Sequence, residues 1–126
     1  MSNTFSSTAP APQTFRVTRS GAKDLQFEGF LLGQANRSAH RPDLDDSGLA
    51  VSVYATAGGK YITHVERTDV LGETKSSAAV HDTPGAAYAW LVADNRGKLG
   101  PVSKAAWSEA CQRWPALTGQ DVEVIA

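Results

Sequence analysis

The stretch LAVSVYATAGGKYITHVER, residues 49–67, decides the fold of this chain. Leu49, Val51, Val53 and Ala55 alternate with their neighbours before Gly58-Gly59, and Tyr61 and Val65 share one face after it, which is the period of a β-strand with one buried face. Two adjacent glycines accept the positive φ angles of a tight hairpin turn. The stretch therefore predicts two antiparallel strands around a Gly-Gly turn.

Toward the N-terminus, the same period of two indicates two more strands. One strand contains Phe15 and Val17, and after a turn at Ser20-Gly21 a second strand runs over residues 25–32. Residues 1–13 are rich in Ser, Thr, Ala and Pro without periodicity, which predicts a disordered tail ahead of a single domain at 14–126. The polar residues 36–48 predict a loop between the second and third strands.

Toward the C-terminus, the pattern changes from strands to helices. We expect a short strand at 78–80 and a helix over 84–94 that is capped by Asp82 or Thr83 and opened by Pro84. A second helix, from 101 or 103 to 114, carries two of the three tryptophans on its apolar face, and the third tryptophan lies on the inner stripe of the first helix. A closing strand at 122–126 completes the pattern. The predicted fold class is α+β, an antiparallel sheet of five to six strands with two helices packed on one face.

Composition narrows the class of protein. The 126 residues have a formal net charge of −1, which gives no global attraction to nucleic acid or to an anionic membrane. The single cysteine, Cys111, cannot form an intramolecular disulfide, and we expect a cytoplasmic protein. No apolar run approaches the ~20 residues that span a bilayer, so no membrane partner is expected.

The sequence contains no set of residues whose types and spacing indicate an active site, a metal site or a cofactor site. Asp43–Gly48 is similar to the first half of a calcium-binding loop, but Tyr54 occupies the position of the closing glutamate. The histidines, His40, His64 and His81, do not share metal-ligand spacing. We therefore predict that the protein is not an enzyme and has no cofactor. The alternative is an enzyme that uses His64 or His81 as a general base.

Cations and one aromatic side chain form the predicted interaction surface. They lie at the first turn, in the long loop and on the Gly-Gly hairpin: Arg16, Arg19, Lys23, Arg37, Arg41, Lys60 and Tyr61. A sheet face that combines cations with an aromatic ring can bind single-stranded nucleic acid by phosphate contact and base stacking. Acidic residues such as Glu28, Glu66 and Asp69 interrupt this charge, and a solvated surface is the alternative interpretation.

Four segments resemble the C-terminal domain of the bacterial EXLDI protein family over residues 25–126. They are FEGFLLG at 27–33, VYATAGGKYITH at 53–64, AVHDTPGAAYAWL at 79–91 and DVEVIA at 121–126. The matching positions are Tyr54, Thr56, Gly59, Tyr61, His64, Asp82 and Thr83. The resemblance implies the fold and a link to regulation, and it carries no catalytic site. This chain departs from the pattern at Val124 and Ala126, and it has only the tail where many members carry a segment similar to a ribbon-helix-helix DNA-binding head.

Together these features predict a small bacterial accessory or regulatory protein, associated with a plasmid or phage, that acts by binding another protein. Direct nucleic-acid binding through the basic first turn and the hairpin is the alternative. A homodimer is a further hypothesis, because sheet edges near Phe15 or Val124 can pair across a twofold axis.

Overall fold

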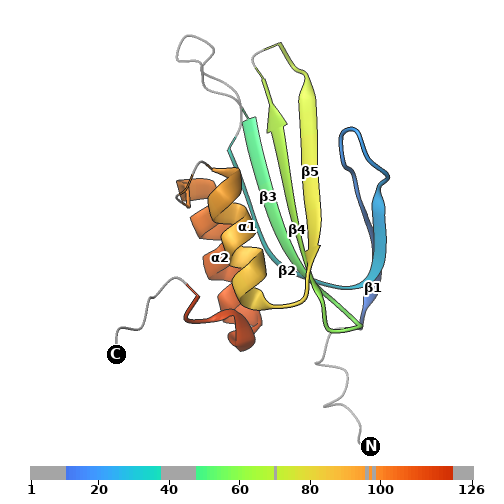
Figure 1. The fold of residues 1–126 in the computed structure, drawn as a ribbon, viewed down its shortest axis with the longest axis vertical. Helices are drawn as coiled ribbons and strands as arrows, with labels where there is room; N and C mark the ends of the chain where they lie inside the picture. The colour runs from blue at the N-terminus through green and yellow to red at the C-terminus, as the bar shows by residue number, and fades with distance from the viewer. Residues whose placement is uncertain (1–10, 38–47, 70, 96, 98, 121–126) are drawn as a thin grey trace, which may run out of the picture.

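A computed structural model of the chain describes residues 11–37, 48–69, 71–95, 97 and 99–120. Within them, five strands precede two helices and a 3-10 turn (Figure 1). The elements are β1 (Gln13–Val17), β2 (Leu25–Arg37), β3 (Gly48–Thr56), β4 (Tyr61–Thr68), β5 (Thr74–His81), α1 (Pro84–Asp94), α2 (Pro101–Arg113) and η3 (Pro115–Leu117). Each strand pairs antiparallel with its neighbour in sequence, in the order β1-β2-β3-β4-β5. The predicted α+β class is confirmed.

The β3–β4 hairpin forms at the Gly-Gly pair, as predicted, but of the two glycines only Gly59 has a positive φ angle. Ala55 lies opposite Tyr61, and the Thr56 N–H donates a hydrogen bond of 2.8 Å to the carbonyl of Lys60. Gly59 has a φ of 88°, a left-handed backbone conformation that glycine adopts without strain. The turn chemistry of this segment therefore fixes the register of the central strand pair.

β5 is longer than the short strand predicted at 78–80. It begins at Thr74, and its polar first half pairs with β4, with Ser76 opposite Glu66. Hydrogen bonding to the neighbouring strand stabilises this polar run, although its side chains give no apolar alternation that could have predicted it. In the same way, β2 continues to Arg37, beyond the predicted start of the loop.

Several predictions fall wholly or partly on residues that the structure does not describe. They concern residues 1–10 of the tail, 38–47 of the long loop with most of its acidic turn, and the closing strand at 122–126. Gln13, placed in the tail by its composition, is the first residue of β1.

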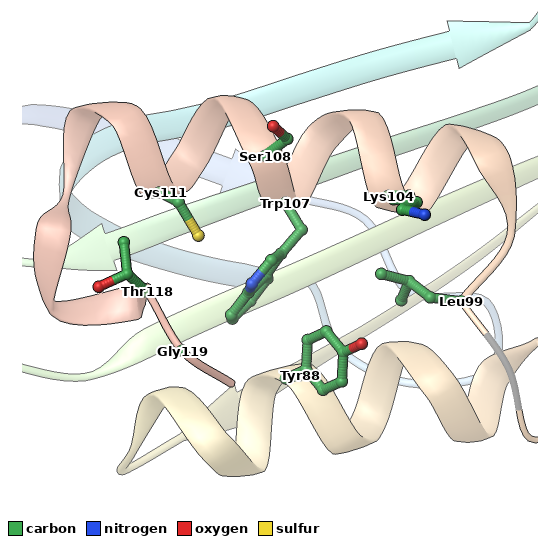
Figure 2. Close-up of a pocket in the computed structure, with 8 residues that line it drawn as sticks. All are labelled: Tyr88, Leu99, Lys104, Trp107, Ser108, Cys111, Thr118 and Gly119. Carbon is green, nitrogen blue, oxygen red and sulfur yellow. The ribbon is translucent and has the colours of Figure 1, made fainter. Parts of the chain in front are cut away.

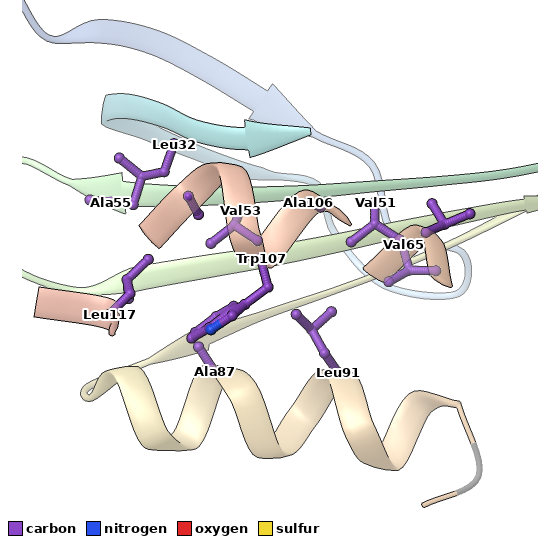
Figure 3. Packing of buried hydrophobic residues seen from close by; sticks show 12 residues of the cluster. Leu32, Val51, Val53, Ala55, Val65, Ala87, Leu91, Ala106, Trp107 and Leu117 are labelled. Atoms are coloured by element: carbon purple, nitrogen blue, oxygen red, sulfur yellow. The ribbon is translucent and has the colours of Figure 1, made fainter. Parts of the chain in front are cut away.

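Both helices lie on the same face of the sheet (Figure 1). Alternate residues of β3 point toward them and form the core with Leu91 of α1 and Trp107 of α2 (Figure 3). Trp107 is only 4% exposed, while Trp90 and Trp114 are half-buried against the same cluster. The predicted inner stripes of both helices are therefore confirmed.

α2 packs directly on the backbone of β2 at Gly33. A Cβ atom at this position would lie 2.1 Å from the carbonyl oxygen of Ala106 and 2.7 Å from the amide nitrogen of Ala110. Only a glycine facing two alanines permits this approach, because real Cβ contacts are never so short. Gly33 thus sets the position of α2 on the sheet.

α1 begins and ends at well-defined contacts. The Thr83 hydroxyl accepts a hydrogen bond of 3.1 Å from the Ala86 N–H, and Pro84 occupies the first turn, as predicted. At its other end, Asp94 accepts a hydrogen bond of 2.6 Å from Arg67 of β4. Among the described residues, no helix combines the length and the apolar character needed to cross a membrane.

The sheet curls away from the helices, so that its other face encloses a second, smaller cluster. Val17, Tyr54 and Ile62 are buried there, and Phe15 and Phe27 pack against them. The curl brings the turn after β1 to β5: the Ser20 N–H donates to the Ser76 carbonyl at 2.8 Å, and the Ser76 N–H donates to the Ser20 hydroxyl at 2.9 Å. These bonds join β5 to the hairpin at the opposite end of the strand order.

Candidate functional site

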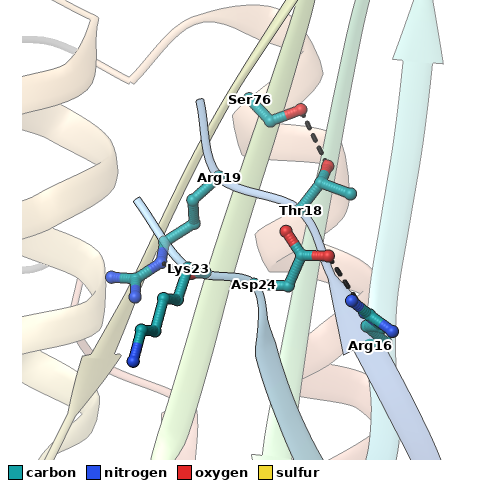
Figure 4. Close-up of polar contacts among 6 residues, drawn as sticks. All are labelled: Arg16, Thr18, Arg19, Lys23, Asp24 and Ser76. Atoms are coloured by element: carbon teal, nitrogen blue, oxygen red, sulfur yellow. Dashed lines mark hydrogen bonds and ion pairs between the residues drawn. The ribbon is translucent and has the colours of Figure 1, made fainter. Parts of the chain in front are cut away.

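The cations of the first turn do not all remain available for a ligand. Arg16 forms an ion pair of 2.9 Å with Asp24 across the β1–β2 hairpin (Figure 4). The Arg19 guanidinium donates a hydrogen bond of 2.7 Å to the carbonyl of Lys23, which places these two cations side by side. The first turn therefore offers two neighbouring positive charges, with the charge of Arg16 partly neutralised.

The remaining residues of the predicted surface lie elsewhere. Lys60 pairs with Asp82 at the Gly-Gly hairpin, and this contact lowers the pKa of the Asp82 carboxyl. Tyr61 is half-buried against the helix-covered core rather than displayed on an open face. Arg37 lines an open hollow of about 560 Å³ at the end of β2, and Arg41 lies outside the described residues.

The first turn and the Gly-Gly hairpin lie at opposite ends of the sheet (Figure 1). Ser20 of the turn bonds to Ser76, whereas Tyr61 of the hairpin pairs with His81. Ser76 and His81 are five positions apart along β5, about 17 Å at the rise of an extended strand. The structure therefore brings Arg19 and Lys23 together and does not unite them with Lys60 in one surface.

His81 forms a buried pair with a hydroxyl group. Its Nε2 lies 2.8 Å from the Thr63 Oγ1, and burial lowers the pKa of the His81 imidazole. Thr63 has no exposed surface. Both side chains are buried, and their contact links β4 to β5.

His64 lies on the inner face of the curled sheet, on the same side of β4 as Ile62 and Glu66, as the alternation predicts. It is 8% exposed, and burial lowers the pKa of its imidazole, opposed by the Glu66 charge and a hydrogen bond to the Thr18 backbone. Its Nε2 is buried without a hydrogen-bond partner among the described residues. A neutral ring tolerates this position, since a protonated ring would bury an unpaired N–H donor.

A groove of about 530 Å³ lies between the two helices (Figure 2). It is lined by Tyr88 of α1, Leu99 of the connection, four residues of α2, and two residues after η3. The α2 residues are Lys104, Trp107, Ser108 and Cys111, and the last two are Thr118 and Gly119. Lys104 and Leu99 lie at one end of the groove, Cys111 and Thr118 at the other, and the Trp107 indole lies between the helices.

The groove has an aromatic floor and a polar rim. The rings of Tyr88 and Trp107 pack edge to face, with centroids 5.3 Å apart. Lys104, Ser108, Thr118 and Gly119 are exposed, so half of the eight lining residues form the rim. An apolar floor with a few polar groups above it is the usual composition of a binding site.

Every charged or strongly polar side chain in this lining can donate a hydrogen bond. Among the described residues that line the groove, Lys104 is the only charged one and none carries a carboxylate. Among the described residues, the Lys104 ammonium has no ion-pair partner, and the indole N–H of Trp107 neither has a hydrogen-bond partner nor is fully buried. The groove is therefore apolar inside and electropositive at the Lys104 end.

The sequence did not predict this groove. It correctly assigned Trp107 and Cys111 to the apolar face of the second helix, but the groove exists only because α1 lies beside α2. One signal was present: Lys104, Ser108 and Cys111 are spaced i, i+4 and i+7, so they form a single stripe along the helix next to the buried one.

Neither a metal site nor a relative adds to this geometry. Within the part of the chain that the structure describes, no group of three or more His, Cys, Asp or Glu side chains could hold a metal ion. Comparison with protein-family models, curated proteins and solved structures finds no match to the chain.

Proposed function

We propose that this protein is a non-catalytic interaction module that binds a protein partner through the groove between α1 and α2. The groove is the observation that supports the proposal, because the half-buried Tyr88 ring lines it together with the edge of the mostly buried Trp107 indole. Tyrosine and tryptophan are enriched among the residues that dominate binding energy at protein interfaces. A cytoplasmic location accords with the single cysteine among 126 residues.

The open shape of the groove favours a protein partner over a small molecule. Small-molecule sites usually enclose most of the ligand surface. Here half of the lining residues are exposed on the outer surface of the helix layer, so a ligand in the groove would keep one side in solvent. A partner protein can cover that side with its own surface.

The test is to block the groove without touching the core. Ser108→Arg places a large side chain in the groove at an exposed position, and Ala105→Arg is the matched control, because Ala105 is also exposed on α2 but does not line the groove. Tagged full-length protein is incubated with nuclease-treated lysate of its native cells. We expect a partner to be recovered by the wild type and by Ala105→Arg and to be reduced at least tenfold with Ser108→Arg.

Equal recovery by both variants would contradict the proposal. Recovery that disappears with nuclease would instead support the alternative of nucleic-acid binding, for which Arg19 and Lys23 supply the adjacent cations. Circular dichroism of each variant checks that the fold is intact.

A further inference from the structure

The charge in the groove restricts what its occupant can be. The lining combines the Lys104 ammonium, the Trp107 indole N–H and three hydroxyl groups, from Tyr88, Ser108 and Thr118. Within the described part of the chain, no carboxylate lines the groove and Lys104 has no ion-pair partner. The groove thus complements a group that accepts hydrogen bonds and carries negative charge.

The positions of Lys104 and of the two aromatic rings set the orientation of a segment bound in the groove. Figure 2 shows Lys104 at one end of the groove, with Tyr88 and Trp107 in its middle. An apolar side chain in the middle would contact both rings, and a carboxylate one or two residues away along an extended segment could reach Lys104 at its end. An acidic residue beside an apolar one is therefore the matching pattern.

We propose that the occupant is a short acidic and apolar segment of the partner protein, with an aliphatic side chain against Tyr88 and Trp107 and a carboxylate on Lys104. This inference rests on the proposed function and makes it more specific. Lys104 lies on the exposed rim, so its carboxylate contact supplies selectivity for acidic segments, while the half-buried Tyr88 ring supplies apolar contact.

The test compares two peptides that differ only in charge. The acidic probe is N-acetyl-Glu-Leu-Glu-Leu-Glu-amide, which places a carboxylate on both sides of each leucine, and the neutral probe replaces every Glu by Gln. Binding to the full chain is followed by the shift of the Trp107 indole N–H signal in proton–nitrogen NMR spectra. We expect the acidic probe to bind about threefold more tightly, the effect of an exposed ion pair, and this preference to vanish at high salt.

Substitutions of Lys104 test whether this residue causes the preference for the acidic probe. Lys104→Met should abolish it, and Lys104→Glu should reverse it. Lys75→Glu is the matched control, because it makes the same change of charge at an exposed position of β5 that does not line the groove. That control should keep the preference of the wild type.

Three results would overturn the inference. One is equal binding of both probes, which would reject the carboxylate contact and leave the proposed function standing if Ser108→Arg still reduces partner capture at least tenfold. Another is the absence of any Trp107 shift at millimolar concentrations of either probe. The third is a dimer of the wild type in sedimentation velocity that dissociates with Ser108→Arg, because the groove would then be filled by a second copy of this chain.

Discussion

His64 gives the fold a pH dependence at the scale of a single residue. Burial holds the pKa of its imidazole below the ordinary value of 6.5, so the folded chain binds a proton less readily than the unfolded chain. Below pH 6.5 protonation then favours the unfolded state, and stability falls until the pH passes the lowered pKa. His81 contributes with the same sign, because burial also lowers the pKa of its ring.

We therefore expect the free energy of unfolding to decrease from pH 7.5 to pH 5, over the range in which histidine titrates. Urea denaturation at several pH values measures it. His64→Gln should flatten part of the decrease, and His64→Gln with His81→Gln should flatten more. If the double variant kept the full dependence, carboxylates rather than these histidines would be its source.

Gly33 controls the approach of α2 to the sheet through one missing methyl group. Gly33→Ala places a Cβ atom 2.1 Å from the Ala106 carbonyl oxygen, so α2 must move, and we expect a loss of about 2–3 kcal/mol in unfolding free energy. Gly58→Ala is the control, because a Cβ atom there meets nothing closer than 3.9 Å. Its effect should stay within about 0.5 kcal/mol. A tolerated Gly33→Ala would show that α2 is not held so closely.

At the scale of an element, the first turn of α1 depends on a side chain outside the helix. Thr83→Ala removes the hydroxyl that accepts the Ala86 N–H and should cost about 1 kcal/mol of stability in urea denaturation. Thr83→Ser retains the acceptor and should restore most of that loss. Equal destabilisation by both substitutions would assign the effect to the methyl group of Thr83 instead.

The elements were predicted unequally well, for a physical reason. The β3–β4 hairpin and α1 are encoded by local chemistry, namely a glycine turn and a Thr-Pro helix start, and both elements formed as predicted, although only Gly59 of the two glycines has a positive φ angle. The first half of β5 has no such signal, because Thr74 and Ser76 become strand residues only through pairing with β4. The curl of the sheet likewise depends on contacts between β5 and a turn more than fifty residues earlier.

At the scale of the whole molecule, closure of the curled sheet rests on a small number of hydrogen bonds. Ser20→Ala removes the acceptor of the Ser76 N–H, and Ser76 is a buried residue. Losing about 1 kcal/mol of hydrogen bonding should speed amide exchange of Ser76 about fivefold, while the core strands stay protected. Ser77→Ala, at an exposed neighbouring position of β5, is the control. Unchanged exchange at Ser76 would mean that the closure is held by other contacts.

The amino-acid sequence by itself determined the fold class, the central hairpin, the start of α1 and the burial of the tryptophan faces, because each follows from periodicity or from turn and cap chemistry within a few residues. It also indicated which side chains carry charge. Only the tertiary structure decided where those charges lie: Lys60 and the first turn are at opposite ends of the sheet, and Arg16 is paired with Asp24. The groove with Lys104 at its end likewise arises only when α1 packs beside α2, since the residues that line it come from four separate segments of the chain.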